Sequence, residues 1–236
     1  MSTAQLTFSF FFLAGLAGCS PEEDAPKSEP EPPAKKVKAG KNIYVEIQGE
    51  KRRRVLIEAT VCLREGQLEM LMCRKQTKEH EAVLSADVDA RDIHKALILA
   101  GAKAGSPVQF SPKFKPATGT VIKVTLQYEK KGKLVTTPAQ EWVRNANTKK
   151  ELDQNWVFGG SRFVPNEEDR TKPDYYLAND GDLLCLCNLE SALMDLPIQS
   201  PKALAERFYE ANTDKIPDRD TKVTVILEPV VQKKDK

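Results

Sequence analysis

The chain has two histidines, His80 and His94, and histidine is the residue type best suited to proton transfer or metal binding near neutral pH. We expect His80 to lie in a strand and His94 in the helix that follows it, fourteen residues later. If the connection folds the helix back over the strand, the two imidazoles meet. Together with Asp92 or a glutamate they would then bind a metal ion or move protons. In the simpler interpretation, each histidine makes one hydrogen bond beside the core.

Four further residues able to do chemistry are the cysteines Cys62, Cys73, Cys185 and Cys187. An even number in an exported protein permits two disulfides. The hairpin expected for residues 55–74 separates its two cysteines by about 13 Å. The other two lie on one strand face about 7 Å apart, outside favourable bridge geometry. Three interpretations remain: unpaired thiols packed as small hydrophobes, cross-disulfides between the two regions, or a metal or iron–sulfur site. The last lacks zinc-ribbon and ferredoxin spacing.

The segment Trp156–Phe163 places aromatic residues beside the pair Gly159-Gly160. This pattern fits a β-bulge near a ligand, and it also fits a core-facing strand. Ser161 is not in a Gly-x-Ser-x-Gly elbow, and the chain contains no P-loop, dinucleotide fingerprint or zinc-protease motif. The sequence therefore supports no nucleophile.

Period-two apolar patterns predict that most of the chain is strand. The expected strands are two hairpins, at residues 55–74 and 121–137, and three further strands at 156–164, 182–189 and 222–227. Asp89 is expected to cap a helix from Ala90, and Ser200-Pro201 is expected to open a second one that runs to Phe208. We therefore predict an α+β fold with a mostly antiparallel sheet and two or three helices, with a sandwich as one possible arrangement.

The first nineteen residues carry no Asp, Glu, Lys or Arg, and they contain a short apolar block that is typical of a secretory signal. The block ends in Leu16-Ala17-Gly18-Cys19, which resembles the bacterial lipobox. We therefore expect a lipoprotein signal peptide at 1–18 and lipid on Cys19. Ser20 follows in place of the Asp that marks inner-membrane retention in enterobacteria, which favours the outer membrane. A cleaved, unlipidated signal and an N-terminal anchor helix are the alternatives.

Proline and charged residues dominate positions 19–41, so we expect this range to be a disordered tether after the lipidated cysteine. Residues 42–230 are expected to form one domain, and 231–236 a polar tail. The chain has 36 Lys+Arg and 34 Asp+Glu, a balance that argues against a nucleic-acid partner.

Three segments together resemble the YdjY-like domain family, which is frequent among exported and lipid-anchored proteins of planctomycete-type bacteria. They are Cys73–Glu81, Asp87–Leu97 with its Ile-His-x-Ala-Leu motif, and Trp156–Ser161. The resemblance covers residues 49–228 and implies a shared fold without naming an activity. The positions that match the family signature form our candidate binding site: Lys78, His80, Glu81, His94, Trp156 and Ser161.

Taken together, these patterns predict a lipid-anchored envelope protein that acts as a non-catalytic binding or structural module. Its expected partners are the membrane, through Cys19, and an envelope protein or glycan. No cofactor is expected. The alternative is a metal-binding or redox protein that uses His80 and His94 or the four cysteines.

Overall fold

The computed structural model describes residues 34–49, 52–167, 170–171, 173–198 and 209–230, which belong to one compact unit spanning 32–236. The expected signal peptide, Cys19, the second expected helix at 200–208 and the polar tail lie outside these residues. None of the described helices is long and apolar enough to cross a membrane.

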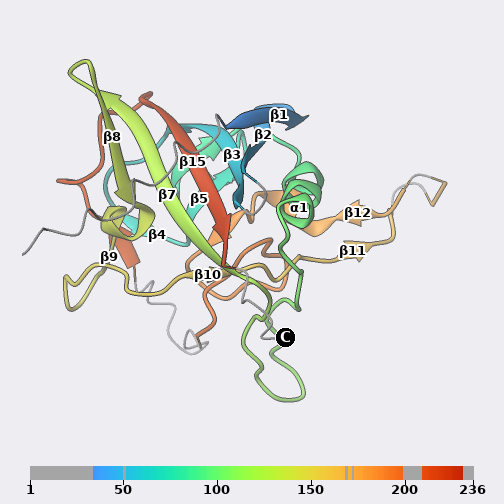
Figure 1. Cartoon of the computed structure of the whole chain (residues 1–236). Coiled ribbons are helices and arrows are strands. Elements are labelled where there is room, and N and C mark those ends of the chain that lie inside the picture. Colours follow the sequence, from blue (N-terminus) through green and yellow to red (C-terminus); the bar gives the residue numbers. More distant parts are fainter. Residues whose placement is uncertain (1–33, 50–51, 168–169, 172, 199–208, 231–236) are drawn as a thin grey trace, which may run out of the picture. The chain divides into compact units, whose positions relative to one another are not determined.

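The main sheet has ten strands among the described residues (Figure 1). Their bounds are β1 Lys35–Gly40, β2 Ile43–Gln48, β3 Arg52–Val61, β5 Met70–Arg74, β6 Ala82–Ala86, β7 Val121–Lys130, β8 Lys133–Pro138, β10 Trp156–Val157, β13 Leu184–Cys185 and β15 Lys222–Pro229. The order is β10-β7-β15-β3-β6-β5-β13, with β2 also paired to β3, β1 to β2 and β8 to β7. Every pair is antiparallel except β5–β6, so the expected mostly antiparallel sheet is confirmed.

Smaller elements complete the described part of the domain. A three-stranded sheet has the order β4 (Gln67–Leu68), β14 (Tyr209–Ala211) and β9 (Val143–Asn145), and β11 (Phe163–Val164) pairs with β12 (Tyr175–Tyr176). Two 3-10 helices are η1 (Ala139–Trp142) and η2 (Leu177–Asp180). The described residues hold one α-helix, α1 (Ala90–Leu99), where we expected two or three.

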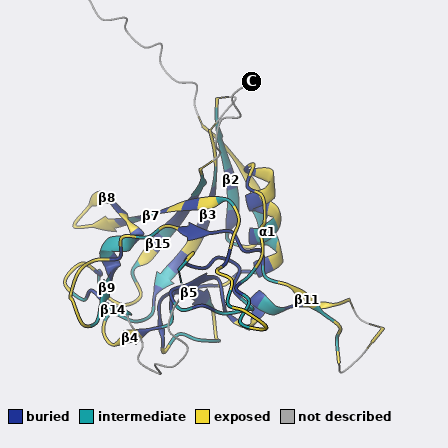
Figure 2. Ribbon diagram, turned by 90° about the horizontal axis from the view of Figure 1, so that it is seen from below, coloured by how far each residue is buried: buried dark blue, intermediate teal, exposed yellow. Residues whose placement is uncertain are grey.

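Helix α1 forms as its sequence predicts. The Asp89 side chain accepts a hydrogen bond from the Arg91 backbone N–H, which caps the first turn. The buried stripe of Ala90, Ile93, Ala96 and Leu97 recurs at helical spacing and faces the core, as the inward and outward sides of α1 in Figure 2 show.

The hairpin formed by β7 and β8 is also confirmed. Lys130 pairs with Lys133, so the turn has two residues, Lys131 and Gly132. Both have positive φ (53° and 73°), the backbone that a tight hairpin of this hand requires.

The other expected hairpin, at residues 55–74, is wrong. Strand β6 lies between β3 and β5: Ser85 pairs with Thr60 of β3 on one side and with Cys73 of β5 on the other. The period-two pattern predicted one apolar face that carries Met70 and Met72, but residues 70–73 are all fully buried, so both faces of β5 are covered. Alternation of apolar residues indicates which face of a strand is buried, and it cannot show that a later strand, β6, inserts between β3 and β5.

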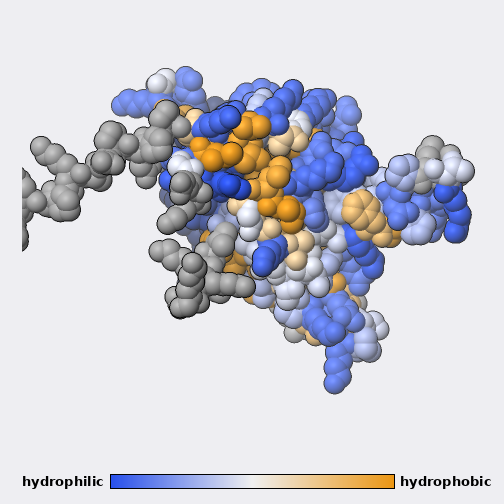
Figure 3. Space-filling view, turned by 45° about the vertical axis from the view of Figure 1, so that its right-hand side comes forward, coloured by the Kyte–Doolittle hydropathy of each residue, from blue (hydrophilic) through white to orange (hydrophobic). Residues whose placement is uncertain are grey.

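The core lies against one face of the main sheet. Odd-numbered residues of β3 and β15 and even-numbered residues of β7 point into it: Val55, Ile57, Ala59, Val61, Val223, Val225, Leu227, Ile122, Val124, Leu126 and Tyr128. The opposite, outer face carries Glu58, Thr60 and Cys62 from β3 and the residue after it. On the side that Figure 3 brings forward, apolar side chains gather in one area bordered by hydrophilic ones.

Strand β1 begins at Lys35, inside the range 19–41 that we expected to be a tether. Lys35 to Gly40 pair with β2, so the ordered part of the chain starts earlier than predicted. Val37 lies opposite Val45 but stays exposed, and the residue of β1 that packs against the core is the partly buried Ala39.

Candidate functional site

Lys78 lies at the centre of a buried polar junction. Its Nζ is 2.6 Å from Oδ1 of Asp182, a carboxylate whose side chain is 2% exposed. Ser191 Oγ donates to the other oxygen, Oδ2, at 2.5 Å. Burial acts to lower the pKa of Lys78, but the hydrogen bond and charge of Asp182 outweigh it, so the pKa is raised and the ammonium form is held.

The turn at residues 75–81 brings Lys78 to this junction. Gly181 (φ 124°) lets it approach, because a Cβ there would lie 2.5 Å from Thr77 Oγ1. Because these residues form turns, the strand that we expected around His80 is wrong.

Ser161 joins the same region through the backbone. Its Oγ donates to the Ser191 carbonyl oxygen at 2.6 Å. The backbone N–H of Ser161 donates to Ala192 O at 3.1 Å, and that of Gly160 donates to Leu193 O at 3.0 Å. The Gly-Gly bend thus seats the segment 159–161 against residues 191–193, and its serine hydroxyl is engaged there.

His94 lies on the other side of this bend. Its Nδ1 is 2.8 Å from Tyr176 Oη, which donates its proton to Gly160 O at 2.6 Å. Nδ1 therefore carries the imidazole proton, because the hydroxyl has only one to give. Phe158 packs edge-on against the ring at 4.8 Å between centroids. Burial lowers the pKa of His94 and favours the neutral ring.

The remaining candidates divide between core and surface. Trp156 is fully buried and its indole N–H donates to Cys185 O at 2.7 Å. The Glu81 side chain is buried, whereas His80 is 73% exposed, with Nε2 3.8 Å from Glu81 Oε2. The described contacts of His80 and His94 have no residue in common. The structure therefore connects Lys78, Ser161 and His94 through short hydrogen bonds, and it leaves His80 outside.

Sequence reasoning missed Asp182, Ser191 and Tyr176, and it also missed Asp195. Asp195 accepts hydrogen bonds from the backbone of Leu196 at 2.8 Å and from neighbouring residues, and burial raises its pKa to about 7. The available signal was an acid directly beside an apolar stretch: Asp182 precedes Leu183–Cys187, and Asp195 follows Ala192–Met194. Such an acid is excluded from the core unless it is paired there.

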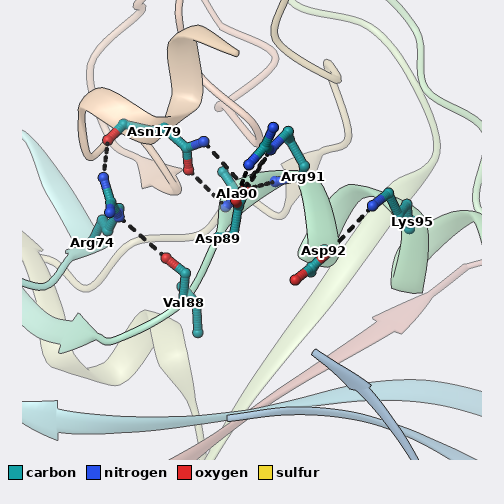
Figure 4. A network of polar contacts seen from close by, with 8 residues as sticks. All are labelled: Arg74, Val88, Asp89, Ala90, Arg91, Asp92, Lys95 and Asn179. Atoms are coloured by element: carbon teal, nitrogen blue, oxygen red, sulfur yellow. Dashed lines mark hydrogen bonds and ion pairs between the residues drawn. The ribbon is translucent and has the colours of Figure 1, made fainter. Parts of the chain in front are cut away.

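A second polar network fixes the start of α1 (Figure 4). Asn179 Oδ1 accepts from Ala90 N at 2.9 Å, and Asn179 Nδ2 donates to Asp89 Oδ1 at 3.2 Å. Arg74 donates to the carbonyl oxygens of Val88 and Asn179. The Arg91 guanidinium beside Asp89 lowers the pKa of that carboxyl to about 2. This network sets the position of the helix that carries His94.

A groove of about 510 Å³ lies on the outer face of the sheet. Cys62 and Ser85 lie in it, together with charged residues of both signs from β3, β15 and the turn after β5. Among the described residues, no three His, Cys, Asp or Glu side chains are grouped as metal ligands would be. The four described cysteines are all free thiols.

Fold and site together define a β-rich domain whose mixed sheet has a buried polar junction at one edge and an open charged groove on its outer face. The chain matches the YdjY domain over residues 40–228. It belongs to that family, which confirms the resemblance seen in the sequence. No curated protein and no solved structure matches the chain at a significant level.

Proposed function

We propose that this protein is a lipid-anchored component of the bacterial envelope and acts as a non-catalytic binding module. The anchor is the lipid on Cys19, at the outer membrane, and the ligand site is the groove on the outer face of the sheet. The motif Leu16-Ala17-Gly18-Cys19 supports the anchor.

The observation that carries the binding role is the contrast between engaged and unengaged side chains. Around Asp182 the candidate residues already satisfy one another: its two oxygens accept from Lys78 and Ser191. In the groove, the side chains of Lys75, Arg219 and Glu58 make no ion pair with any described residue. Charges in a concave surface that the fold does not use are available to a ligand.

The groove also indicates the kind of ligand. Asp87 pairs with Lys41 at 2.6 Å, and apart from it the lining carries three basic and three acidic side chains. They are Lys75, Arg219, Lys222, Glu58, Glu79 and Asp220. A balanced lining favours a ligand that carries both signs of charge, such as a segment of an envelope protein or the peptide part of an envelope glycan.

Charge reversal in the groove tests the binding role. The double variant Lys75→Glu/Arg219→Glu should reduce the fraction of protein that sediments with purified cell-wall sacculi and envelope membranes by at least fivefold. The matched control is Lys113→Glu/Lys115→Glu in the loop between α1 and β7, which changes the charge by the same amount at exposed positions that do not line the groove. Equal sedimentation of the two double variants would contradict the proposal.

The anchor needs its own experiment. Intact-mass spectrometry of the protein from native membranes should show a diacylglyceryl-modified Cys19. The variant Cys19→Ala should move the protein from the membrane to the soluble fraction. An unmodified cysteine in membrane-bound protein would remove the anchor from the proposal and leave the groove untouched.

The alternative, a metal-binding or redox protein, is favoured by one observation. Cys62 and Cys73 lie on the two sides of β6, and the influence of Cys73 lowers the pKa of Cys62. The histidine version has no comparable support, because His94 is engaged with Tyr176 and His80 is exposed. The same mass measurement under non-denaturing conditions would detect a bound metal.

A further inference from the structure

Strand β1 is the part of the described chain that lies closest, along the sequence, to the expected anchor. The described residues begin at 34, and Lys35 opens β1, sixteen residues after Cys19. An extended chain of that length spans at most about 55 Å, so a lipid on Cys19 would keep β1 near the bilayer surface. Among the described strands β1 pairs only with β2, which makes it an edge strand of the main sheet.

This edge of the sheet is strongly basic. Strands β1 and β2 and the first three residues of β3 carry one acid, Glu46, against six bases: Lys35, Lys36, Lys38, Arg52, Arg53 and Arg54. The excess of five positive charges is local, because the whole chain has a net charge of only +2. The three lysines of β1 are exposed, and none of them forms an ion pair with a described residue. Their charge is therefore available to a negatively charged surface.

Apolar side chains are exposed beside these lysines. Val37 lies among them in β1 and is 42% exposed, and Ile98 and Leu99 at the end of α1 are 46% and 61% exposed. Val37 lies opposite Val45, a residue of the core, so its side chain is on the side of the sheet that α1 covers.

One row of paired residues connects the end of α1 to the start of β1. Arg53 Nη1 donates to the Leu99 carbonyl oxygen at 3.2 Å. Arg53 lies opposite Ile47, and Ile47 lies opposite Lys35. The backbones of Arg53 and Lys35 are therefore two strand spacings apart, about 10 Å. The exposed end of the helix and the first lysine of β1 thus lie at the same corner of the domain.

These six residues, Lys35, Lys36, Val37, Lys38, Ile98 and Leu99, form what we call the β1 edge. Side chains alternate along a strand, so Lys36 and Lys38 project from one side of β1 and Lys35 from the other. Exposed apolar side chains flanked by lysines suit the interface of a bilayer. There the ammonium groups meet anionic headgroups, and the lysine stems and apolar side chains enter the boundary with the acyl chains.

We propose that the β1 edge docks on an anionic bilayer, the same one that holds the lipid of Cys19; this inference rests on the lipid anchor of the proposed function. Each lysine near an anionic surface strengthens the attachment about fivefold. The anchor makes docking an intramolecular step, so contacts that are too weak to hold a free protein are sufficient. The groove uses residues 58–62 of β3 and its end, beyond the stretch Arg52–Arg54 at this edge, so docking leaves the groove open to a ligand.

Lysine acylation on vesicles tests the docking. The mature protein from native membranes is inserted through its lipid into vesicles of phosphatidylcholine, alone or mixed with anionic phosphatidylglycerol, and a pulse of an uncharged acylating reagent is read by peptide mass spectrometry. Acylation of Lys35, Lys36 and Lys38 should be at least threefold slower on the anionic vesicles, and high salt should remove the difference. Lys113 and Lys115 are the internal controls, because they are exposed in the loop between α1 and β7, which Figure 1 shows well away from β1.

Equal rates for the β1 lysines on the two kinds of vesicle would overturn the proposal. That is the result expected if these lysines only prevent the edge strand from pairing with strands of other molecules.

Variants test the β1 edge itself. Lys36→Glu/Lys38→Glu should return the acylation of Lys35 on anionic vesicles to its rate on phosphatidylcholine, and Leu99→Ser should return part of it. Charge reversal of the two loop lysines is the matched control and should leave Lys35 protected. If the first double variant is poorly folded by tryptophan fluorescence, Leu99→Ser, at an exposed position, carries the test. Full protection of Lys35 in the folded variants would refute the role of the β1 edge.

The same digest separates docking from anchoring, because the mass of the peptide that contains Cys19 reports the lipid directly. Lipid on Cys19 with equal lysine rates would remove the docking and leave the anchor in place. A Cys19 without lipid would remove the anchor. Sedimentation of that protein with anionic but not with neutral vesicles would still establish docking, whereas equal sedimentation with both would refute it.

Discussion

Polar side chains pair with one another at the buried junction around Asp182, whereas several charged side chains on the outer face of the main sheet have no ion-pair partner among the described residues. At the buried junction, each oxygen of Asp182 has its own donor, and the two donors come from distant segments, the 75–81 turn and the loop after β13. On the outer face, Lys75 and Arg219 make no ion pair with a described residue. Inside the domain, polar groups hold the loops together, so removing one should cost stability. Outside, removing one should cost binding and leave stability unchanged.

The largest effect should come from Asp182→Ala. It leaves the Lys78 ammonium and the Ser191 hydroxyl without their shared acceptor, and breaking a buried pair in this way costs about 3–5 kcal/mol of unfolding free energy. Urea unfolding followed by the fluorescence of the two buried tryptophans measures it. The control is Asp218→Ala, whose partner is Arg64 and whose side chain is 92% exposed; its cost should stay below about 1 kcal/mol. Similar costs for both variants would contradict the comparison.

The next effect is a dependence of stability on pH that comes from Asp195. Its pKa is about 7 in the folded chain and about 4 in an unfolded one. The unfolded state therefore binds fewer protons between these values, and stability falls as pH rises from 4 to 7. The contribution is at most about 4 kcal/mol, at 1.36 kcal/mol per pKa unit.

Unfolding free energies at pH 5 and pH 8 test this. Asp195→Asn should flatten the dependence, because an amide does not ionise. A variant that keeps the full wild-type slope would show that another group is responsible.

A smaller effect is expected at the start of α1. Asp89→Ala removes the cap and should cost about 1 kcal/mol at pH 7. Because the pKa of Asp89 is lowered to about 2 in the folded chain, its contribution is present above pH 4 and disappears as pH falls toward 2. The difference between wild type and variant in thermal unfolding should therefore shrink at pH 2.5. A difference that is unchanged there would mean that Asp89 acts without its charge.

The smallest effect on stability should come from the groove. Lys75→Ala and Arg219→Ala should each change the unfolding free energy by less than about 0.5 kcal/mol, because these exposed side chains have no ion pair to lose. The check is urea unfolding in parallel with the sedimentation experiment. A cost above 1 kcal/mol would show that the groove charges serve the fold, as those of the junction do.

The features of the fold and the site that could be predicted from the sequence are those set by residues close to one another in the chain. The cap at Asp89 and the turn at Lys131-Gly132 are set by neighbours in the chain, and both were predicted correctly. The placement of Ser85 between Thr60 and Cys73 depends on a strand that arrives twenty residues later, and no local pattern encodes it. Of the site, Lys78, Ser161 and His94 were found through the family signature. Their partners Asp182 and Tyr176 come from segments about 80 to 100 residues away.

The main sheet can be completed only after the last described strand of the chain has been synthesised. Strand β15 lies between β3 and β7 in the middle of the main sheet, although it is the final described strand of the chain. During synthesis, β3 and β7 are made long before the strand that joins them, so the main sheet can be completed only after residue 229 has left the ribosome. If the protein is exported, as we propose, most of the chain is made before its central sheet can close.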